Sequence, residues 1–377
     1  MDKKGDYHEK LGLSRSEFED SLEKFSQKSY DGQEHEWDYR HLPDYHHDLY
    51  KGTVLIDGNV VQGFPKIPRT LILEEGIPRH FDGEVVVEEK MDGYNTRVVR
   101  IDGEVLAFSR SGIICPFTTH KVKKILPLEP FFDDNPDAML CGEMVGSENP
   151  YTTHGYPGVD SLEFRAFDIR GRESGKSLAV EERRAVCEEY GIPQVELYGI
   201  FDVEDTPDEV KRVVKKLDEE GREGIVMKSH DVSQQLKYTT SAANQGDLEF
   251  AFSLPFDYGR DFMFRRLIRE AFQAVEWQEN EEELEERAHG LGESILKPMV
   301  ETIHEIDEGE YVGERHTVRA EPDVVERLFD HFGEMGLHID IEEDRQENGE
   351  RVVKFVKRSQ ATNDKTRVYL DGQIVRE

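Results

Sequence analysis

The stretch from Thr53 to Lys237 constrains the fold most, because it consists of short strand-like runs separated by turn signals. Two of these runs, Thr96–Ile101 and Glu104–Ser109, are joined by Asp102-Gly103, a dipeptide that favours a two-residue hairpin turn. The other strands that we predict here are Thr53–Ile56, Gly83–Glu89, Met139–Val145, Leu162–Ile169 and Gly224–Lys228, and the helices are Val180–Tyr190 and Pro207–Glu219. Antiparallel strands with interspersed helices predict an α+β fold.

Smaller units are predicted at both ends of the chain. Near the N-terminus, Phe18, Leu22 and Phe25 share one face of a helix that Ser14 or Ser16 can cap. Near the C-terminus we expect a helix at Pro322–Glu334, a hairpin turning at Asn348-Gly349 and a final strand at Thr366–Leu370. The predicted units are an N-terminal module (1–60), a central α+β domain (61–245), a helical segment (246–315) and a C-terminal α+β domain (316–377).

The helical segment carries two apolar stripes at helical spacing. Their members are Phe264, Leu267, Ile268, Ala271, Phe272 and Val275, and then Leu291, Ile295, Met299 and Ile303. Such stripes suit either a dimer interface or ordinary core packing. The acidic run Glu279–Glu286 between them is interpreted as a solvated helix face or loop.

The charge balance excludes a protein that coats nucleic acid through a basic surface. Asp and Glu number 81 against 48 Lys and Arg, a net charge of −33, so phosphate backbones are repelled except at a local basic groove. The strongest basic cluster in the central domain is a weak candidate for such a groove, and a solvated helix face is the preferred interpretation: His120, Lys121, Lys123 and Lys124. The acid excess throughout the chain favours a salt-adapted cytoplasm over an ordinary acidic surface.

Other features of the composition narrow the class of protein. The three cysteines, Cys115, Cys141 and Cys187, form no CxxC pair, which argues against a disulfide scaffold or a thiolate zinc site. No apolar run is long enough to span a membrane, and the first ten residues lack a signal-peptide core, so we expect a soluble cytoplasmic protein. The histidines of the stretch 35–47 are interpreted as surface residues rather than metal ligands.

The stretch Glu88–Arg97 holds the residue most suited to chemistry. Lys90 ends one strand-like run, the tight turn Asp92-Gly93 follows, and a second run then begins. A lysine in this place lies on the floor of a cleft, where Gly93 allows the backbone to approach a ligand. Lysine is a nucleophile only when deprotonated, so it needs a depressed pKa. Alone, the pattern is also that of an ordinary hairpin.

A series of further motifs follows in order within about 150 residues, each a short strand-like run with one or two functional side chains. The series comprises Ser109-Arg110, Gly142–Gly146, Phe164–Ile169, Glu223–Lys228 and Leu236–Tyr238. Together with Glu88–Arg97, this set resembles the six motifs of the covalent nucleotidyltransferases, the superfamily of ATP-dependent ligases and mRNA capping enzymes. Within it, the chain is most similar to the archaeal homodimeric ATP-dependent RNA ligases, through Glu88–Asn95, Ser109–Gly112, Cys115–Thr119, Gly142-Glu143, Asn149–Tyr151 and Lys237–Ser241.

The resemblance covers essentially the whole chain, and it implies a mechanism and a fold. Lys90 would attack the α-phosphate of ATP, expel pyrophosphate and form a lysyl-AMP. The AMP would pass to an RNA 5′-phosphate, and a 3′-hydroxyl would then attack that adenylate, seal the phosphodiester and release AMP. The implied fold is an antiparallel-sheet nucleotidyltransferase domain, like that of ATP-grasp-type ligases, and the implied partners are RNA ends and a second copy of the chain.

The same resemblance implies roles for the other residues. Lys228 and Lys237 would hold the α-phosphate, and their charge would lower the pKa of Lys90. Glu223 would hold Mg²⁺ or Mn²⁺, directly or through water. Thr239 departs from the wider ligase pattern, in which many relatives carry a second lysine there, and this leaves the residues that hold pyrophosphate unassigned.

Around the nucleoside, each implied role has a structural alternative. Phe167 would stack on the adenine with Val226 on its other face, although a strand aromatic in the core fits Phe167 nearly as well. Arg110 and Glu143 would contact the ribose, Glu89 would accept from the adenine amino group and so favour ATP over GTP, and Arg97 would brace the site or a phosphate. An ion-pair network on the sheet explains Glu89, Arg97 and Glu143 as well.

Three other functions remain open at this point. A DNA ligase uses the same motifs, and a capping guanylyltransferase uses GTP, but both usually carry an added five-stranded barrel, whereas we predict mostly helix after Lys237. An acidic binding or scaffold protein would form no covalent nucleotide adduct.

Overall fold

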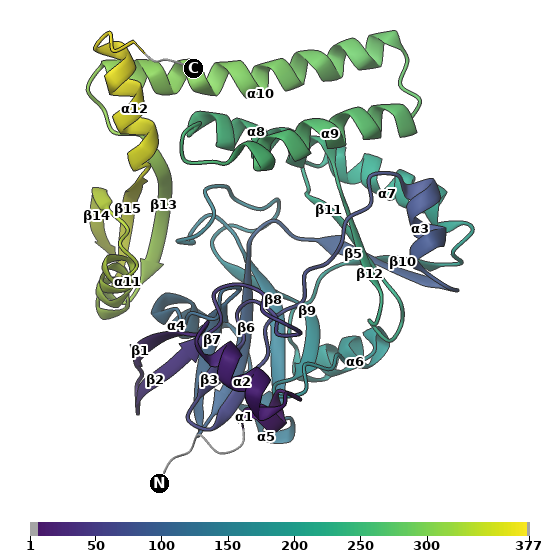
Figure 1. Ribbon diagram of the computed structural model, residues 1–377, viewed down its shortest axis with the longest axis vertical. Helices are drawn as coiled ribbons and strands as arrows, with labels where there is room; N and C mark the ends of the chain where they lie inside the picture. The colour runs from purple at the N-terminus through teal and green to yellow at the C-terminus, as the bar shows by residue number, and fades with distance from the viewer. Residues whose placement is uncertain (1–6, 375–377) are drawn as a thin grey trace.

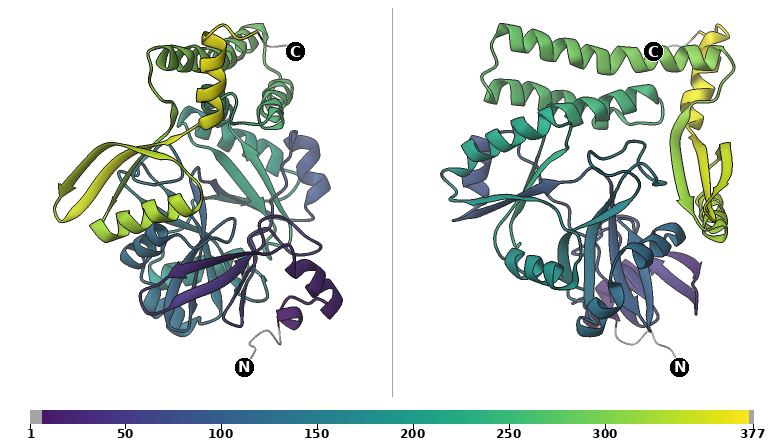
Figure 2. Two further views of the ribbon diagram at one scale, coloured as in Figure 1. Left: turned by 60° about the vertical axis from the view of Figure 1, so that its left-hand side comes forward. Right: turned by 180° about the vertical axis from the view of Figure 1, so that it is seen from behind.

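The computed structural model describes residues 7–374 and confirms the α+β fold with antiparallel sheets. Figure 1 shows the N-terminal sheet at the bottom, two further sheets above and beside it, and a layer of long helices at the top. The C-terminal unit lies along one side of the molecule, between the helical layer and helix α4 (Figures 1 and 2). None of the helices within residues 7–374 is both long and apolar enough to cross a membrane.

The N-terminal unit is a four-stranded antiparallel sheet with two short helices packed on it. The helices are α1 (Tyr7–Lys10) and α2 (Arg15–Leu22), and the strands, in sheet order, are β1 (Ser26–Asp31), β2 (Glu36–His41), β3 (Val54–Ile56) and β4 (Asn59–Val61). Helix α2 begins as predicted, because the Ser14 hydroxyl accepts a hydrogen bond from the Glu17 amide. The prediction did not include β1 and β2.

Two four-stranded sheets form the centre of the molecule. The first has the order β10-β5-β11-β12 and the second the order β7-β6-β8-β9. Their strands are β5 (Val85–Lys90), β6 (Tyr94–Ile101), β7 (Glu104–Ser109), β8 (Ala138–Val145), β9 (Glu163–Gly171), β10 (Leu197–Phe201), β11 (Gly224–Lys228) and β12 (Gln235–Thr239). Every strand predicted between Gly83 and Lys228 is present, with ends that differ by at most two residues.

Helices cover the central sheets and supply much of their core. They are α3 (Leu73–His80), α4 (Pro116–Ile125), α5 (Leu128–Asp134), α6 (Val180–Tyr190) and α7 (Thr206–Glu219). Helices α3 and α7 bury Leu73, Ile77, Val210 and Val214 against one face of the first sheet. The opposite face of that sheet is therefore available for a ligand.

The remaining elements form the helical layer and the C-terminal unit. Helices α8 (Ser241–Ser253) and α9 (Arg260–Glu276) lie beneath the long helix α10 (Glu281–Asp307) (Figure 1). The C-terminal unit contains β13 (Gly313–Ala320), α11 (Pro322–Glu334), β14 (Ile339–Glu347), β15 (Glu350–Arg358) and α12 (Gln360–Leu370). The strand predicted at Thr366–Leu370 is wrong, because β13 completes the sheet and α12 instead buries Thr362, Asn363 and Thr366.

Part of the basic cluster on α4 contacts the C-terminal unit, whereas a solvated helix face was the preferred interpretation. Lys124 pairs with Glu321 of the C-terminal unit at 3.1 Å and with Glu350 at 2.8 Å. His120 also contacts Glu321, and the ammonium of Lys121 lies over the Phe117 ring. The charge of Lys124 is therefore neutralised where α4 meets the C-terminal unit.

The histidine-rich loop and the cysteines contain other side chains that could bind a metal ion. His46 and His47 each place Nε2 at 3.1 Å from Asp20 Oδ2, a proximity that the sequence did not reveal. His41 is buried, unlike the surface position expected for it, and its Nδ1 lies 2.8 Å from the Ser111 carbonyl oxygen. The three cysteines, Cys115, Cys141 and Cys187, are free and buried.

Candidate functional site

The turn Met91–Gly93 connects β5 of the first sheet to β6 of the second, and it places Lys90 where the two sheets meet. Gly93 is required there, because a Cβ at this position would lie 2.2 Å from the Met144 carbonyl oxygen on β8. The turn is thus packed directly against the second sheet, and Lys90 is held at the end of β5.

Strand alternation gathers the polar residues of the first sheet on the face that the core helices leave free. On β12, Leu236 and Tyr238 join the core with α3 and α7, while Gln235 and Lys237 face the other way. That free face and the edge of the second sheet enclose a pocket of about 380 Å³. Its lining includes Phe64, Ile67, Glu89, Lys90, Asn95, Arg110, Glu143, Phe167, Val226, Lys228, Gln235 and Lys237.

Carboxylates surround the Lys90 ammonium. Its Nζ forms an ion pair with Glu223, and Glu143 is a further neighbouring charge. Burial acts to lower the pKa of Lys90, but Glu223 and Glu143 outweigh it and the pKa is raised. This corrects the expectation that Lys228 and Lys237 depress it.

The pKa values of Glu143 and Glu223 are raised. Burial raises the pKa of Glu143 to about 8 and that of Glu223 to about 7, although the Lys90 charge opposes both shifts. Both groups therefore exchange protons near neutral pH, as acid–base groups of an active site do.

Lys228 is held by a buried carboxylate that the sequence analysis did not assign. Lys228 Nζ donates to Glu88 Oε2 and to the Phe167 carbonyl oxygen, both at 2.8 Å. Glu88 is fully buried and also contacts Arg183 and Arg184. Since one carboxylate faces three cations, the group keeps a net positive charge beside the pocket. The signal for Glu88 was its position, two residues before Lys90 on a strand and hence on the same face.

Lys237 is a different kind of cation, because no carboxylate within residues 7–374 pairs with it. Burial, the Lys90 charge and Arg69 together lower the pKa of Lys237 to about 7. Arg110, on the other side of the pocket, likewise has no carboxylate partner in the described part of the chain. Uncompensated cations that line a pocket suit an anionic ligand.

Aromatic and apolar side chains form another part of the wall. The Phe167 ring meets the Phe64 ring edge-on at 5.2 Å, and Val226 lies on the same pocket lining. Phe64 and Ile67 come from the irregular segment between β4 and α3, and nothing in their sequence pattern pointed to the site. A flat apolar slot of this kind suits a nucleobase.

Glu89 forms an ion pair beside the pocket, and Arg97 braces the surrounding backbone. Glu89 accepts hydrogen bonds from Arg222, at 3.0 Å, and from the Tyr156 hydroxyl, and its side chain reaches both the pocket and a second cavity beside it. Arg97 donates to the carbonyl oxygens of Gly52 and Ser109, each at 2.9 Å, and to that of Gln62. It ties the N-terminal unit to β7 and is not part of the pocket lining.

Glu223 has the geometry of a candidate cation ligand. Its side chain is 15% exposed, and Oε2 is buried without any hydrogen-bond partner. A buried carboxylate oxygen without a partner is costly, and a divalent cation would satisfy it. The structure thus brings nine of the ten residues predicted for the site into or against the pocket, with Arg97 as the exception.

Comparisons with known proteins agree with this geometry. Residues 83–239 match the family model described as RNA ligase, and residues 250–373 match the one described as the C-terminal region of ligase Pab1020. An uncharacterized protein of Methanocaldococcus jannaschii is 44% identical over 340 residues, which is 86% of each chain.

Solved structures extend the similarity to nearly the whole chain. Two forms of an archaeal ATP-dependent RNA ligase superpose with TM-scores of 0.91 and 0.90, at 38% and 37% identity, over 98% of each chain. An Aquifex aeolicus protein, provisionally described as an ATP-dependent DNA ligase, gives a TM-score of 0.89 at 27% identity, over 96% of this chain and 100% of that one.

Proposed function

Because this chain belongs to the family of archaeal ATP-dependent RNA ligases, we propose that it uses ATP to join an RNA 5′-phosphate to a 3′-hydroxyl. The observation that carries the proposal is the position of Lys90, in contact with Glu223 on the floor of a pocket that Lys228 and Lys237 also line. Ligation would run through a lysyl-AMP and then an RNA-adenylate.

Lys90 performs the first step once its ammonium has lost a proton. Glu223 is in contact with Nζ and has a pKa of about 7, so its carboxylate accepts that proton more readily than an ordinary glutamate would. The amine then attacks the α-phosphorus, the N–P bond forms, and the bond to the β-phosphate breaks with release of pyrophosphate. The AMP is then transferred to the 5′-phosphate of the RNA, which restores the Lys90 amine.

The cations of the pocket stabilise charge on the phosphates. Lys228 is fixed by Glu88 and the Phe167 carbonyl, so it supplies a positioned charge. Within residues 7–374 no carboxylate competes for Lys237, so its ammonium can pair with phosphate oxygens.

The apolar wall would receive the adenine. Phe167 and Val226 would lie on either side of the base, while Arg110 and Glu143 would contact the ribose. For Glu89 to accept from the adenine amino group, the base must share this carboxylate with Arg222 and Tyr156.

Glu223 would also hold Mg²⁺ or Mn²⁺ through its unpartnered Oε2. Such an ion would neutralise phosphate charge when bound. The residues present fit it, since Asp92 and Glu143 add negative charge nearby.

We further propose that the chain forms a homodimer through α9 and α10. The faces of these helices that pack inside the chain bury several polar side chains, Glu270, Gln273 and Thr302 among them, beside a few apolar ones such as Ile306. Other large apolar side chains of the same helices are exposed: Val275 is 74% exposed and Leu296 is 62% exposed. A second copy of this apolar surface is the natural cover for it.

DNA ligation is the second candidate, since the Aquifex aeolicus protein is similar over nearly the whole chain. Against it, the elements after β12 within residues 7–374 are helices α8–α12 and a three-stranded sheet, with no five-stranded barrel.

Incubation with α-labelled ATP and Mg²⁺ or Mn²⁺, followed by denaturing electrophoresis, tests the first step. We expect label on the wild-type protein, no label on Lys90→Ala, and full label on the control Lys124→Ala, which alters a cation outside the pocket. Pyrophosphate treatment beforehand strips protein that was purified already adenylylated. Absence of label after that treatment would refute the proposal.

Joining assays then identify the polynucleotide. Matched RNA and DNA strands with 5′-phosphate ends would be offered with ATP or GTP. RNA joining with ATP alone is the expected result, whereas preferential DNA joining would establish the second candidate.

A further inference from the structure

The segment Pro68–Thr70 extends the first sheet by one short strand alongside β12. The Lys237 amide donates to the Pro68 carbonyl at 3.0 Å, and the Thr70 amide donates to the Lys237 carbonyl at 3.3 Å. This parallel bridge pairs Arg69 with Lys237. Paired residues in a sheet share a face, so Arg69 lies on the same side as the pocket lysine.

The Arg69 guanidinium is oriented by Thr239. Its Nη1 donates to Thr239 Oγ1 at 2.7 Å, and Thr239 follows Lys237 by two residues on the same face of β12. Thr239 is the position at which the sequence departs from the wider ligase pattern. In this chain, an arginine from another segment brings a positive charge to that position.

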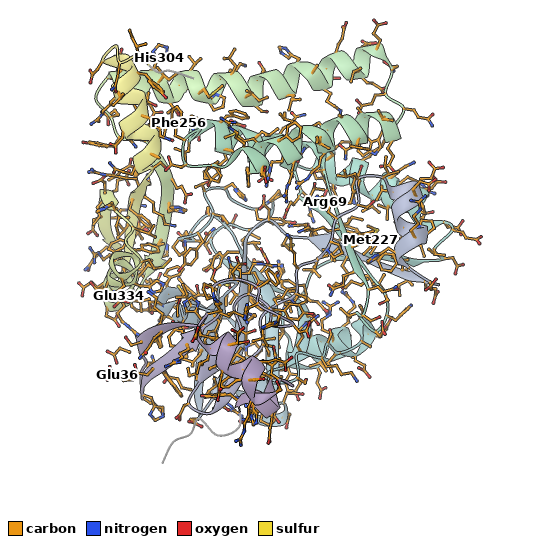
Figure 3. The ribbon with its side chains drawn as sticks, in the orientation of Figure 1. Glu36, Arg69, Met227, Phe256, His304 and Glu334 are labelled. Carbon is orange, nitrogen blue, oxygen red and sulfur yellow. The ribbon has the colours of Figure 1, made fainter. Side chains whose placement is uncertain are left out.

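Helix α9 places two further arginines, Arg266 and Arg269, near Arg69. Figure 3 shows Arg69 between the sheet that carries Met227 and the helices α8 and α9. Arg269 and Arg69 line one cleft with Thr239 and Asn244, and Arg266, one turn earlier on α9, is a close neighbouring charge of both arginines. Arg266 is paired with Asp247 at 2.6 Å.

Neither Arg69 nor Arg269 has a carboxylate partner within residues 7–374, although the chain holds 81 acidic residues. The carboxylates nearby are already engaged: Glu270 pairs with Arg287 at 2.6 Å, Asp247 with Arg266, and Glu223 with Lys90. Burial, together with the like charges of Arg69 and Arg266, lowers the pKa of Arg269 to about 10. Half-buried cations left together in this way are costly unless an anion joins them.

We propose that Arg69, Arg269 and Lys237 form a phosphate-binding site between the nucleotide pocket and α9. The ligand class is a phosphate or pyrophosphate group, because two planar guanidinium groups and an ammonium match several phosphate oxygens at once. Two sources supply this chemistry, the β- and γ-phosphates of ATP and a phosphate of the RNA. The choice between them rests on the proposed ligase function, but the existence of the site does not.

Direct binding tests the site independently of ligation. Inorganic pyrophosphate is titrated calorimetrically into full-length Lys90→Ala, which cannot form an adduct. In double variants that combine Lys90→Ala with Arg69→Ala or Arg269→Ala, the affinity for pyrophosphate should fall by about 10-fold or more, the loss typical of a charge-assisted hydrogen bond. Adding Arg79→Ala, an exposed arginine paired with Glu75, should change nothing. Arg69→Lys keeps the charge if Arg69→Ala unfolds. Unchanged affinity in Arg69→Ala and Arg269→Ala, or in Arg69→Lys and Arg269→Ala if Arg69→Ala unfolds, would overturn the proposal.

Two single-turnover experiments, made in protein that keeps Lys90, identify whether the bound phosphate comes from ATP or from RNA. If the site holds the ATP tail, the arginine variants slow formation of lysyl-AMP. If it holds RNA, lysyl-AMP forms at the normal rate, but transfer from preloaded protein to a 5′-phosphorylated RNA is slowed. Absence of lysyl-AMP in the wild type would refute the ligase function and leave the pyrophosphate titration as the test of the site.

Discussion

Lys237 shows how burial tunes a single cation in the pocket. Its pKa of about 7 lies below the ordinary lysine value, so its ammonium is present below pH 7 and is lost as the pH rises through 7. Affinity for ATP should therefore fall above pH 7 in the wild type. Lys237→Arg keeps its charge, and its affinity relative to wild type should rise by up to ~10-fold per pH unit above that point. Parallel pH profiles from equilibrium binding would contradict this.

Glu88 is a carboxylate that stabilises the folded protein. Burial acts to raise its pKa, but Lys228 and Arg183 outweigh it and the pKa is lowered. Glu88→Gln leaves three cations without their shared counter-charge, and should cost about 3–5 kcal/mol of unfolding free energy in urea. Glu75→Gln breaks only an exposed pair with Arg79 and should cost less than about 1 kcal/mol. Equal losses in the two variants would refute this role.

At the scale of elements, the outward apolar side chains of α10 make a specific prediction. Leu296→Glu with Val300→Glu places two charges on the exposed stripe and should convert a dimer to a monomer in light scattering after gel filtration. Ile341→Glu alters an equally exposed apolar residue on β14 and should leave the mass unchanged. A wild-type monomer, or a dimer that persists in the double variant, would exclude this interface.

The elements also show what sequence patterns reveal and what they miss. The strands around Lys90 were predictable because apolar runs, turn dipeptides and a functional lysine coincide there. β1 was not, since its six residues are mostly polar and exposed. Nine of the ten residues found by motif lie in or against one pocket, but the raised pKa of Lys90 depends on Glu223 and Glu143 meeting across two sheets. Arg69 was likewise invisible, because only tertiary pairing brings it beside Lys237.

For the whole molecule, the net charge of −33 predicts a dependence on salt. Charges on the surface repel one another over a screening length of about 10 Å at 0.1 M salt, which shrinks to about 3 Å at 1 M. The melting temperature should therefore rise as KCl is increased over this range, and an uncharged osmolyte at equal osmolality should raise it less. A flat or falling melting temperature would contradict adaptation to salt.

The turn Met91–Gly93 has a mechanical consequence for the molecule, because Lys90, the proposed nucleophile, lies at the point where one sheet passes into the other. If the sheets rotate against each other about this turn, points far from it travel furthest and Lys90 travels least. Glu143 and Lys237 lie on different sheets and would move apart, while Lys90 would stay near the axis of rotation. Such a rotation would widen the pocket for a bulky RNA end while moving Lys90 least.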